Sequence, residues 1–368
     1  MSAPARRGAL ESWESLWFGE ASLVRLAVCR IALMLSAFHA VMTHRFAVLQ
    51  PARGLEVGYL DRRWQPLYLF EVLGIGPPGE LLARTALVVI CIAVALGLVG
   101  VMTRVACAIT AIGTLWWIGV AYSFGQPHHG AVALVLGLAF LPFAPVGKRL
   151  SLSSLMRRGS GPPPERAAFA NVPVLFTAIT ISIGYAAAGI SKLVIGGLEW
   201  MNGYTFLAML HQFDGPWTDA FSSGLFEARL FSVGLIAIQV GFPLALFFPR
   251  TRWILLPGAF AFHLMAMMTM ETGPFLSLWT LLVVFVPCEQ VPGWLDQRLL
   301  EGPSVRRWLW AVISVGALVL YLALFLPAVP ASLRPVVVLL ALAPVAAYIH
   351  RVRVRGSGGV PTARPARS

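Results

Sequence analysis

The sequence predicts an all-α fold: a polytopic transmembrane helical bundle of about ten helices, with no large extramembrane domain. Of the 368 residues, 58% are hydrophobic and only 12% are charged, and the mean hydropathy is +0.77. Soluble domains carry about 25% charged residues, so this composition excludes an ordinary soluble protein. Apolar segments of about 20 residues, the length needed to cross a bilayer, also recur along the chain.

The apolar stretches divide the chain into four parts. We expect a cytoplasmic segment at 1–20, a transmembrane domain at 21–292, two additional helices within 293–350, and a disordered basic tail at 351–368. The expected spans, placed to within a few residues, are 22–48, 80–102, 103–124, 129–147, 169–195, 229–249, 252–271, 274–291, 307–327 and 333–350. The 34 glycines and 26 prolines fit such helices, because neighbouring helices re-satisfy backbone groups freed at a kink.

The positions of the basic residues predict the orientation. With Arg6 and Arg7 in the cytoplasm, most loop arginines and the basic tail fall on the same side. The long loop 196–228 falls on the other side, with four acidic residues and no basic one. Both termini are therefore predicted inside, and the net charge of +12 is explained without a nucleic-acid partner. Residues 151–168, rich in Ser, Gly and Pro, are predicted to be a flexible inner linker between two helical halves.

The cysteines and histidines do not predict a metal site. Cys29, Cys91, Cys107 and Cys288 lie in or beside predicted spans without CxxC spacing, which supports neither a metal cluster nor a disulfide framework. The histidine spacing matches no ligand pattern. The phosphate-binding, dinucleotide-binding and hydrolase motifs of soluble enzymes are also absent from the sequence.

Lys192 ends the apolar run that begins near Val172, and it is one of only two lysines in a chain with 26 arginines. A lysine in this position is costly unless it reaches the interface, finds a partner or loses its proton. One interpretation is a snorkelling lysine anchored beside Trp200. The other is a base, since a desolvated lysine can be neutral whereas arginine cannot.

Histidines form the second group of candidates. His128 and His129 precede the fourth span, where they could stabilise a developing anion or relay protons, or could be an interfacial pair without a role. His263 lies inside an apolar span, either facing a pocket or as a satisfied packing residue. The predicted topology brings Lys192 and the His128-His129 pair to the outer side, where they could meet in one cavity.

Three motifs carry a family resemblance. They are His129 opening the fourth span, Tyr185-x3-Gly189-x2-Lys192-Leu193 with Trp200 and Gly203, and Phe262-His263-Leu264-Met265 before Gly273-x-Phe275. In order and spacing they resemble the vitamin K-dependent gamma-glutamyl carboxylase superfamily. The closer similarity is to its bacterial branch of horizontally transferred transmembrane (HTTM) domains, over roughly residues 20–290.

The resemblance implies a multi-pass bundle in a bacterial cytoplasmic (inner) membrane, enclosing a pocket for a reduced quinone such as vitamin K hydroquinone or menaquinol. It implies Lys192 as the base and His129, or else His128, as the residue that stabilises an oxyanion. It also implies that His263, Tyr185 and Trp200 line the cofactor site. O2 and CO2 would be co-substrates, no metal would be required, and a peptide or small molecule on the outer face would be carboxylated.

The sequence departs from the carboxylases in two ways. The segment between Lys192 and Trp200 is longer, and the lumenal domain that helps to hold protein substrates in animal carboxylases is not expected. Two hypotheses follow: a membrane enzyme that uses a reduced quinone and O2, or a non-enzymatic quinone-binding or assembly subunit or small-solute transporter. Transport ranks lower, because the ionisable groups gather near the outer face rather than at the membrane midplane.

Overall fold

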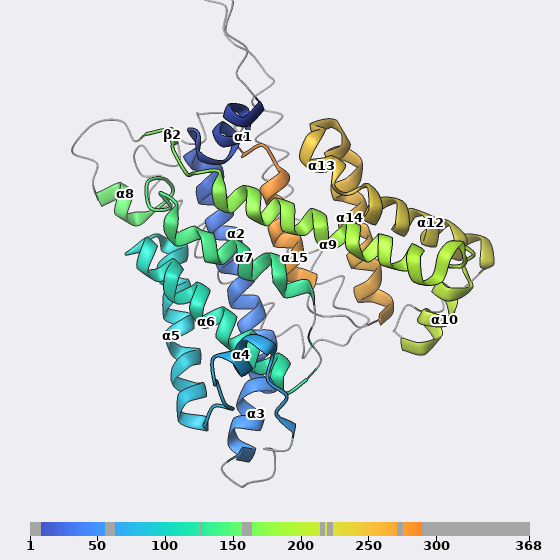
Figure 1. Ribbon diagram of the computed structural model, residues 1–368, viewed down its shortest axis with the longest axis horizontal. Helices are drawn as coiled ribbons and strands as arrows, with labels where there is room; N and C mark the ends of the chain where they lie inside the picture. The colour runs from blue at the N-terminus through green and yellow to red at the C-terminus, as the bar shows by residue number, and fades with distance from the viewer. Residues whose placement is uncertain are drawn as a thin grey trace, which may run out of the picture.

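The computed structural model describes residues 9–55, 63–125, 127, 129–156, 164–213, 218, 224–270 and 275–288, and these are mostly helical (Figure 1). The long helices are α2 (Leu23–Thr43), α5 (Glu80–Val99), α6 (Thr103–Ser123), α9 (Val172–Gly196), α12 (Leu225–Gly241) and α14 (Arg252–Met270). Shorter helices are α1 (Ala9–Phe18), α3 (Arg45–Leu55), α4 (Tyr68–Val72), α7 (Val132–Phe140), α8 (Leu152–Met156), α10 (Tyr204–Phe213), α13 (Leu244–Phe247) and α15 (Phe275–Leu281). The 3₁₀ turns are η2 (His129–Ala131), η3 (Leu141–Phe143), η4 (Gly197–Met201), η5 (Pro249–Thr251) and η6 (Leu282–Phe285). The predicted helices within 293–350 and the tail lie outside the described residues.

Helix α2 is the centre of the bundle. It contacts α5, α6, α7, α9 and α15 (Figure 1), and most of its side chains are buried. A helix that is apolar on all sides has no face suited to water, so it is covered by its neighbours. Ser22 begins it as the N-cap, accepting a hydrogen bond from the Arg25 backbone N–H at 3.3 Å.

The helices around α2 form two arms. Helices α5 and α6 make a hairpin on one side, and the Trp117 Nε1–H of α6 donates to the Val41 carbonyl of α2 at 3.0 Å. Helices α9, α12 and α14 make the other arm, which extends away from α2 with α10 at its tip (Figure 1). Helix α15 contacts both α2 and α14, and it therefore joins the arms.

One end of the bundle is closed by short strands and arginine side chains. Strand β1 (Ala21–Ser22) pairs with β2 (Arg166–Ala167) in antiparallel fashion, so α2 and α9 begin side by side. At this end Arg25 donates to the Val284 carbonyl at 3.0 Å, and Arg252 to the Phe285 carbonyl at 3.1 Å. This is the end that the basic residues predict to be cytoplasmic.

Arg30 of α2 is fully buried and makes the innermost of these contacts. Its guanidinium donates to the Val146 carbonyl at 2.7 Å and to the Leu150 carbonyl at 2.5 Å. Both carbonyls lie in the irregular chain after η3, where no helix supplies backbone donors. A buried arginine in an apolar helix is tolerated when such acceptors surround it, so Arg30 and this segment stabilise each other.

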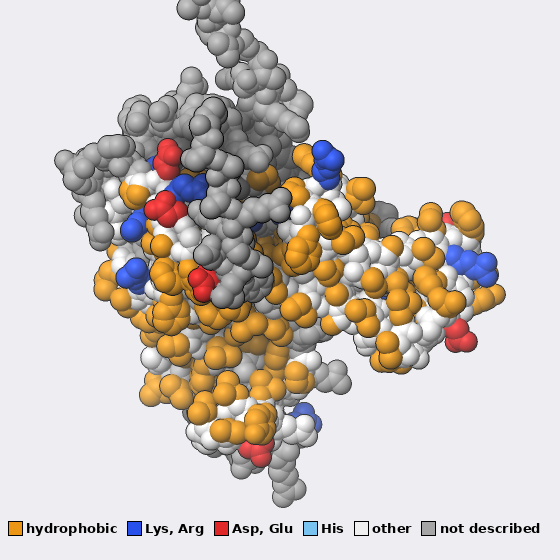
Figure 2. All heavy atoms as spheres, turned by 45° about the horizontal axis from the view of Figure 1, so that its top comes forward, with side chains coloured by type: hydrophobic (Ala, Val, Ile, Leu, Met, Phe, Trp, Pro, Cys, Tyr) orange, Lys and Arg blue, Asp and Glu red, His pale blue; other side chains and the backbone are white. Residues whose placement is uncertain are grey.

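The described surface is suited to lipid. Four helical segments are long and apolar enough to cross a membrane: Leu23–Thr43, Glu80–Val99, Thr103–Ser123 and Val172–Met201. Their outward side chains are large and apolar, and hydrophobic side chains cover broad areas of the surface (Figure 2). Such continuous apolar surface is unfavourable in water but stable against acyl chains. The predicted all-α transmembrane fold is confirmed in this respect.

Several predicted spans are shorter in the structure. The expected span 129–147 becomes α7 and η3, because Pro142 ends regular helix, and 229–249 is divided between α12 and α13 at Pro243. The linker expected at 151–168 is structured at both ends, where α8 and β2 lie. The Ser153 hydroxyl there donates to the Gly100 carbonyl at 2.8 Å, which attaches the start of this segment to the end of α5.

Replacing Arg30 with methionine is expected to lower the thermal unfolding temperature in detergent, as measured by intrinsic fluorescence. The buried Val146 carbonyl would lose its donor, at a cost of about 1–3 kcal/mol, and the part-buried Leu150 carbonyl would lose one as well.

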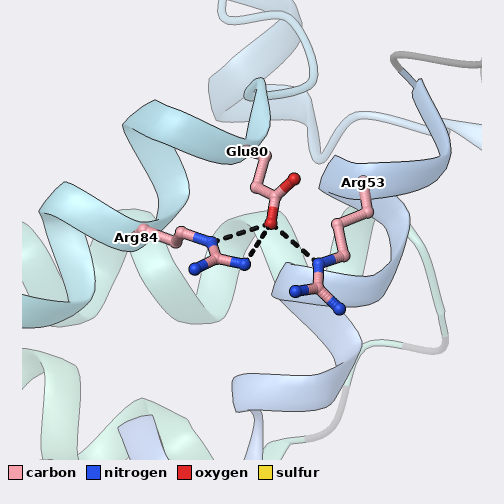
Figure 3. Close-up of polar contacts among 3 residues, drawn as sticks. All are labelled: Arg53, Glu80 and Arg84. Atoms are coloured by element: carbon pink, nitrogen blue, oxygen red, sulfur yellow. Dashed lines mark hydrogen bonds and ion pairs between the residues drawn. The ribbon is translucent and has the colours of Figure 1, made fainter.

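The matched control is Arg84→Met, which removes an arginine of the exposed Arg53–Glu80–Arg84 cluster between α3 and α5 (Figure 3). Exposed ion pairs contribute little, so this variant should unfold at the wild-type temperature. Equal unfolding temperatures for the two variants would contradict the role given to Arg30.

Candidate functional site

One face of α9 carries the residues predicted to form the site. Ser182, Tyr185, Gly189 and Lys192 are spaced by three, four and three residues, which places them on one side of a helix. The first three are buried and Lys192 is half-buried. This polar side of α9 packs against α12. The contact between these two helices is extensive, and among the contacts of α9 only the one with α7 is larger.

Tyr185 and His263 form a buried hydrogen bond between α9 and α14. The Tyr185 Oη lies 2.6 Å from the His263 Nε2, and the side chains are only 6% and 4% exposed. The Tyr185 ring also stacks on the Phe242 ring, with ring centroids 4.2 Å apart. The His263 ring contacts the Tyr185 ring in a T-shaped, edge-on arrangement. Apolar rings thus enclose a short polar contact, which strengthens it because water does not compete.

The stretch after Tyr185 brings α12 very close. A Cβ added at Gly189 would lie 2.9 Å from the Gln239 Cβ and 3.0 Å from the Val240 backbone nitrogen, so only glycine permits this approach. Gln239 lies one helical turn before Phe242, the residue whose ring stacks on Tyr185. Within the described residues, neither the Gln239 Oε1 nor the Ser182 Oγ has a hydrogen-bond partner, although both are buried.

Lys192 has different surroundings. Its Nζ donates to the Ala188 carbonyl of its own helix at 3.3 Å and lies 5.4 Å from the centroid of the Trp200 ring. The neighbouring Ile195 and Leu198 are 83% and 75% exposed on the apolar surface. These contacts are those of a lysine held beside Trp200 near the membrane interface. The assignment of Lys192 as a base remains a prediction.

The predicted histidine pair is only partly described. His128 lies outside the described residues, and for His129 only the backbone in η2 is described. Helix α7 runs antiparallel to α9, since the rings of Phe140 and Phe176 stack and Gly137 lies against Thr177. Continued for about two turns at 1.5 Å per residue, this register places the start of α7 near the level of Tyr185.

The structure therefore divides the predicted site residues into pairs. Tyr185 contacts His263, and Lys192 contacts Trp200. No cluster of three or more metal-ligating side chains occurs among the described residues. The prediction omitted Gln239, although an amide in the apolar run from Leu230 to Phe248 is the signal that marks a polar site inside a membrane.

Fold and site together define an integral membrane protein: a bundle of apolar helices with a buried polar site where two of them meet. A family model described as the HTTM domain matches residues 20–289, well over half of the chain. The protein belongs to the HTTM family, and the predicted resemblance to the vitamin K-dependent carboxylase-like proteins is confirmed at this level. No curated protein and no solved structure matched the chain.

Changing Tyr185 to phenylalanine is expected to destabilise the protein by about 1–3 kcal/mol, because His263 loses a buried partner while the stack on Phe242 is kept. Chemical unfolding in detergent, followed by fluorescence, measures the change. Tyr204→Phe, at a tyrosine that is 60% exposed, is the control and should leave the free energy of unfolding unchanged. If the two substitutions have the same effect, the Tyr185–His263 contact does not hold α9 to α14.

Proposed function

We propose that the protein is an integral membrane enzyme of the vitamin K-dependent carboxylase-like type, which oxidises a reduced quinone with O2. In this proposal the reaction drives removal of a proton from a peptide or small molecule at the outer face and its carboxylation by CO2. The proposed location is the cytoplasmic membrane of a bacterium, with several helices crossing it and both termini inside. Membership of the HTTM family supports the class of protein.

The single observation that carries the proposal is the buried Tyr185–His263 hydrogen bond on the helix face that leads to Lys192. Ionisable and hydroxyl side chains inside an apolar bundle are costly, so their presence favours a binding or chemical role. Phe242 supplies an aromatic surface against this contact. A quinone ring needs the same combination of apolar walls and a few convergent polar groups.

The residues present fit a hydroquinone. Its ring can stack against aromatic side chains, and its two hydroxyl groups require hydrogen-bond partners in a dry site. Tyr185 and His263 can each donate or accept, and the Ser182 Oγ is buried without a partner in the described part of the chain. In the proposal these side chains hold the ring. A bound hydroquinone would supply the four electrons that reduce O2, one oxygen atom being retained in the quinone epoxide and the other becoming water.

The proposed part of Lys192 is that of a proton acceptor. A lysine amine that sheds its proton in an apolar setting can take one from a hydroxyl group, which guanidinium cannot do. The carbonyl of Ala188 and the ring of Trp200 orient this amine. His129, or His128, would stabilise the resulting oxyanion from the start of α7.

A second candidate is a non-enzymatic role in quinone binding or assembly, or transport of a small solute. The observation in its favour is that the contacts of Lys192 are those of an interfacial anchor beside Trp200. Quinone binding without turnover would be the signature of that role.

Purified protein supplied with vitamin K hydroquinone or menaquinol and O2 is expected to form epoxide, and Lys192→Ala and Lys192→Arg should both lose at least about 100-fold in rate, the size of a general-base effect. Chromatographic detection of the epoxide measures this. The arginine variant tests the chemistry, because its guanidinium can lie against an aromatic ring as a lysine does but stays protonated and cannot act as a base.

Lys148→Arg is the control, since Lys148 is the other lysine of the chain and is exposed at the opposite end of the bundle. It should turn over at the wild-type rate. Full activity in Lys192→Arg would remove the base assignment, and absence of epoxide from the wild type would favour the non-enzymatic role.

A further inference from the structure

Arg53 of α3 and Arg84 of α5 converge on a single carboxylate oxygen (Figure 3). The Nε atoms of both side chains donate to the Glu80 Oε1 at 2.7 Å, and the Arg84 Nη2 contacts the same oxygen. Two positive charges therefore share one negative charge. Neither guanidinium has another partner among the described residues, so the cluster keeps a net positive charge and unused N–H donors.

Arg84 lies on a part of α5 that faces lipid. Leu81, Arg84 and Val88 are spaced by three and four residues, so they form one stripe along the helix. Leu81 is 80% exposed and Val88 is exposed as well, on a helix long and apolar enough to cross a membrane. The contact with Glu80, the first residue of α5, directs the guanidinium toward the helix end. An arginine so placed reaches the level of the lipid headgroups.

Helix α4 shows that this end of the bundle lies at the membrane surface. Phe70 of α4 is buried against Gly119, near the end of α6 that adjoins the start of α5 in the α5–α6 hairpin. On the outer side of the same short helix, Tyr68 is 81% exposed and Val72 is also exposed. Large apolar side chains gathered at a surface favour contact with a bilayer over water. The arginine cluster is thus at the depth where lipid phosphate groups lie.

We propose that Arg53 and Arg84 bind the headgroup phosphate of an anionic phospholipid, with one acyl chain along Leu81 and Val88. A guanidinium offers N–H groups in a planar fork that matches two oxygens of a phosphate. Glu80 orients both guanidinium groups, and the remaining positive charge favours a lipid with net negative charge over a zwitterionic one. A lipid satisfies both parts of the site, since its phosphate pairs with the arginines while its chain covers the apolar stripe. Lipid binding there does not depend on the proposed reaction.

Native mass spectrometry of the purified protein tests this site. Dissociation constants for the first bound lipid are compared for phosphatidylglycerol and phosphatidylcholine with the same acyl chains. The wild type is expected to bind phosphatidylglycerol at least about fivefold more tightly, which corresponds to the contribution of one arginine near a membrane surface. In the double variant Arg53→Gln/Arg84→Gln the preference should fall below about twofold.

Arg104→Gln/Arg250→Gln is the matched control, because it removes the same charge from two exposed arginines at the opposite end of the bundle. It should keep the wild-type preference. Both double variants should unfold at the wild-type temperature in detergent without lipid, since exposed ion pairs contribute little to stability. Excess glycerol 3-phosphate should not displace the bound lipid, because it lacks the acyl chains.

Equal affinity of the wild type for the two lipids would overturn the proposal, and that measurement needs no variant. A preference retained in Arg53→Gln/Arg84→Gln, or lost equally in the control, would place the lipid elsewhere and would also overturn it. Displacement by glycerol 3-phosphate would refute the assignment to a lipid, since the apolar stripe would then contribute nothing.

Discussion

The hydrogen bond between the Tyr185 hydroxyl and the His263 imidazole links α9 and α14, two helices that otherwise make few contacts with each other. In a membrane, apolar side chains gain little by leaving lipid for protein, so packing and hydrogen bonds must select the arrangement of the helices. This bond fixes how α9 faces α14, and the stack on Phe242 fixes the same face against the end of α12. The placement of Gly189, Gln239 and Lys192 follows from that orientation.

At the opposite end of the bundle, hydrogen bonds from arginine side chains hold the chain in place. There the chain leaves regular helix, and its carbonyl groups need donors that lipid cannot supply. Arg30 supplies them from within α2, and Arg25 and Arg252 do so nearer the surface. Arginines at the end that is predicted to be cytoplasmic thus also complete the fold. A lysine could not serve equally well, since its single ammonium lacks the planar fork of donors.

The apolar pattern of the sequence was sufficient for the fold class but not for the helix ends. The predicted edges of α5, α6 and α9 were close, because each is a continuous apolar run without proline beyond its first turn. The edges of α14 were close as well, although Pro257 lies inside it. The extent of α7 and α12 was overestimated, since hydropathy does not register where Pro142 or Pro243 ends the hydrogen-bonding pattern. The spans predicted after residue 292 lie outside the described residues.

The site was predictable where a residue is unusual in its surroundings, as with Lys192 and His263. Which residues meet was not predictable, because the contact between Tyr185 and His263 joins residues 78 positions apart and depends on how their two helices are rotated.

Gly189 restricts how α9 can be rotated against α12. Backbone of α12 lies where its side chain would be, so the two helices cannot separate or slide at this level without losing the contact. The close approach at Gly189 therefore closes this level of the α9–α12 contact to a bulky ring.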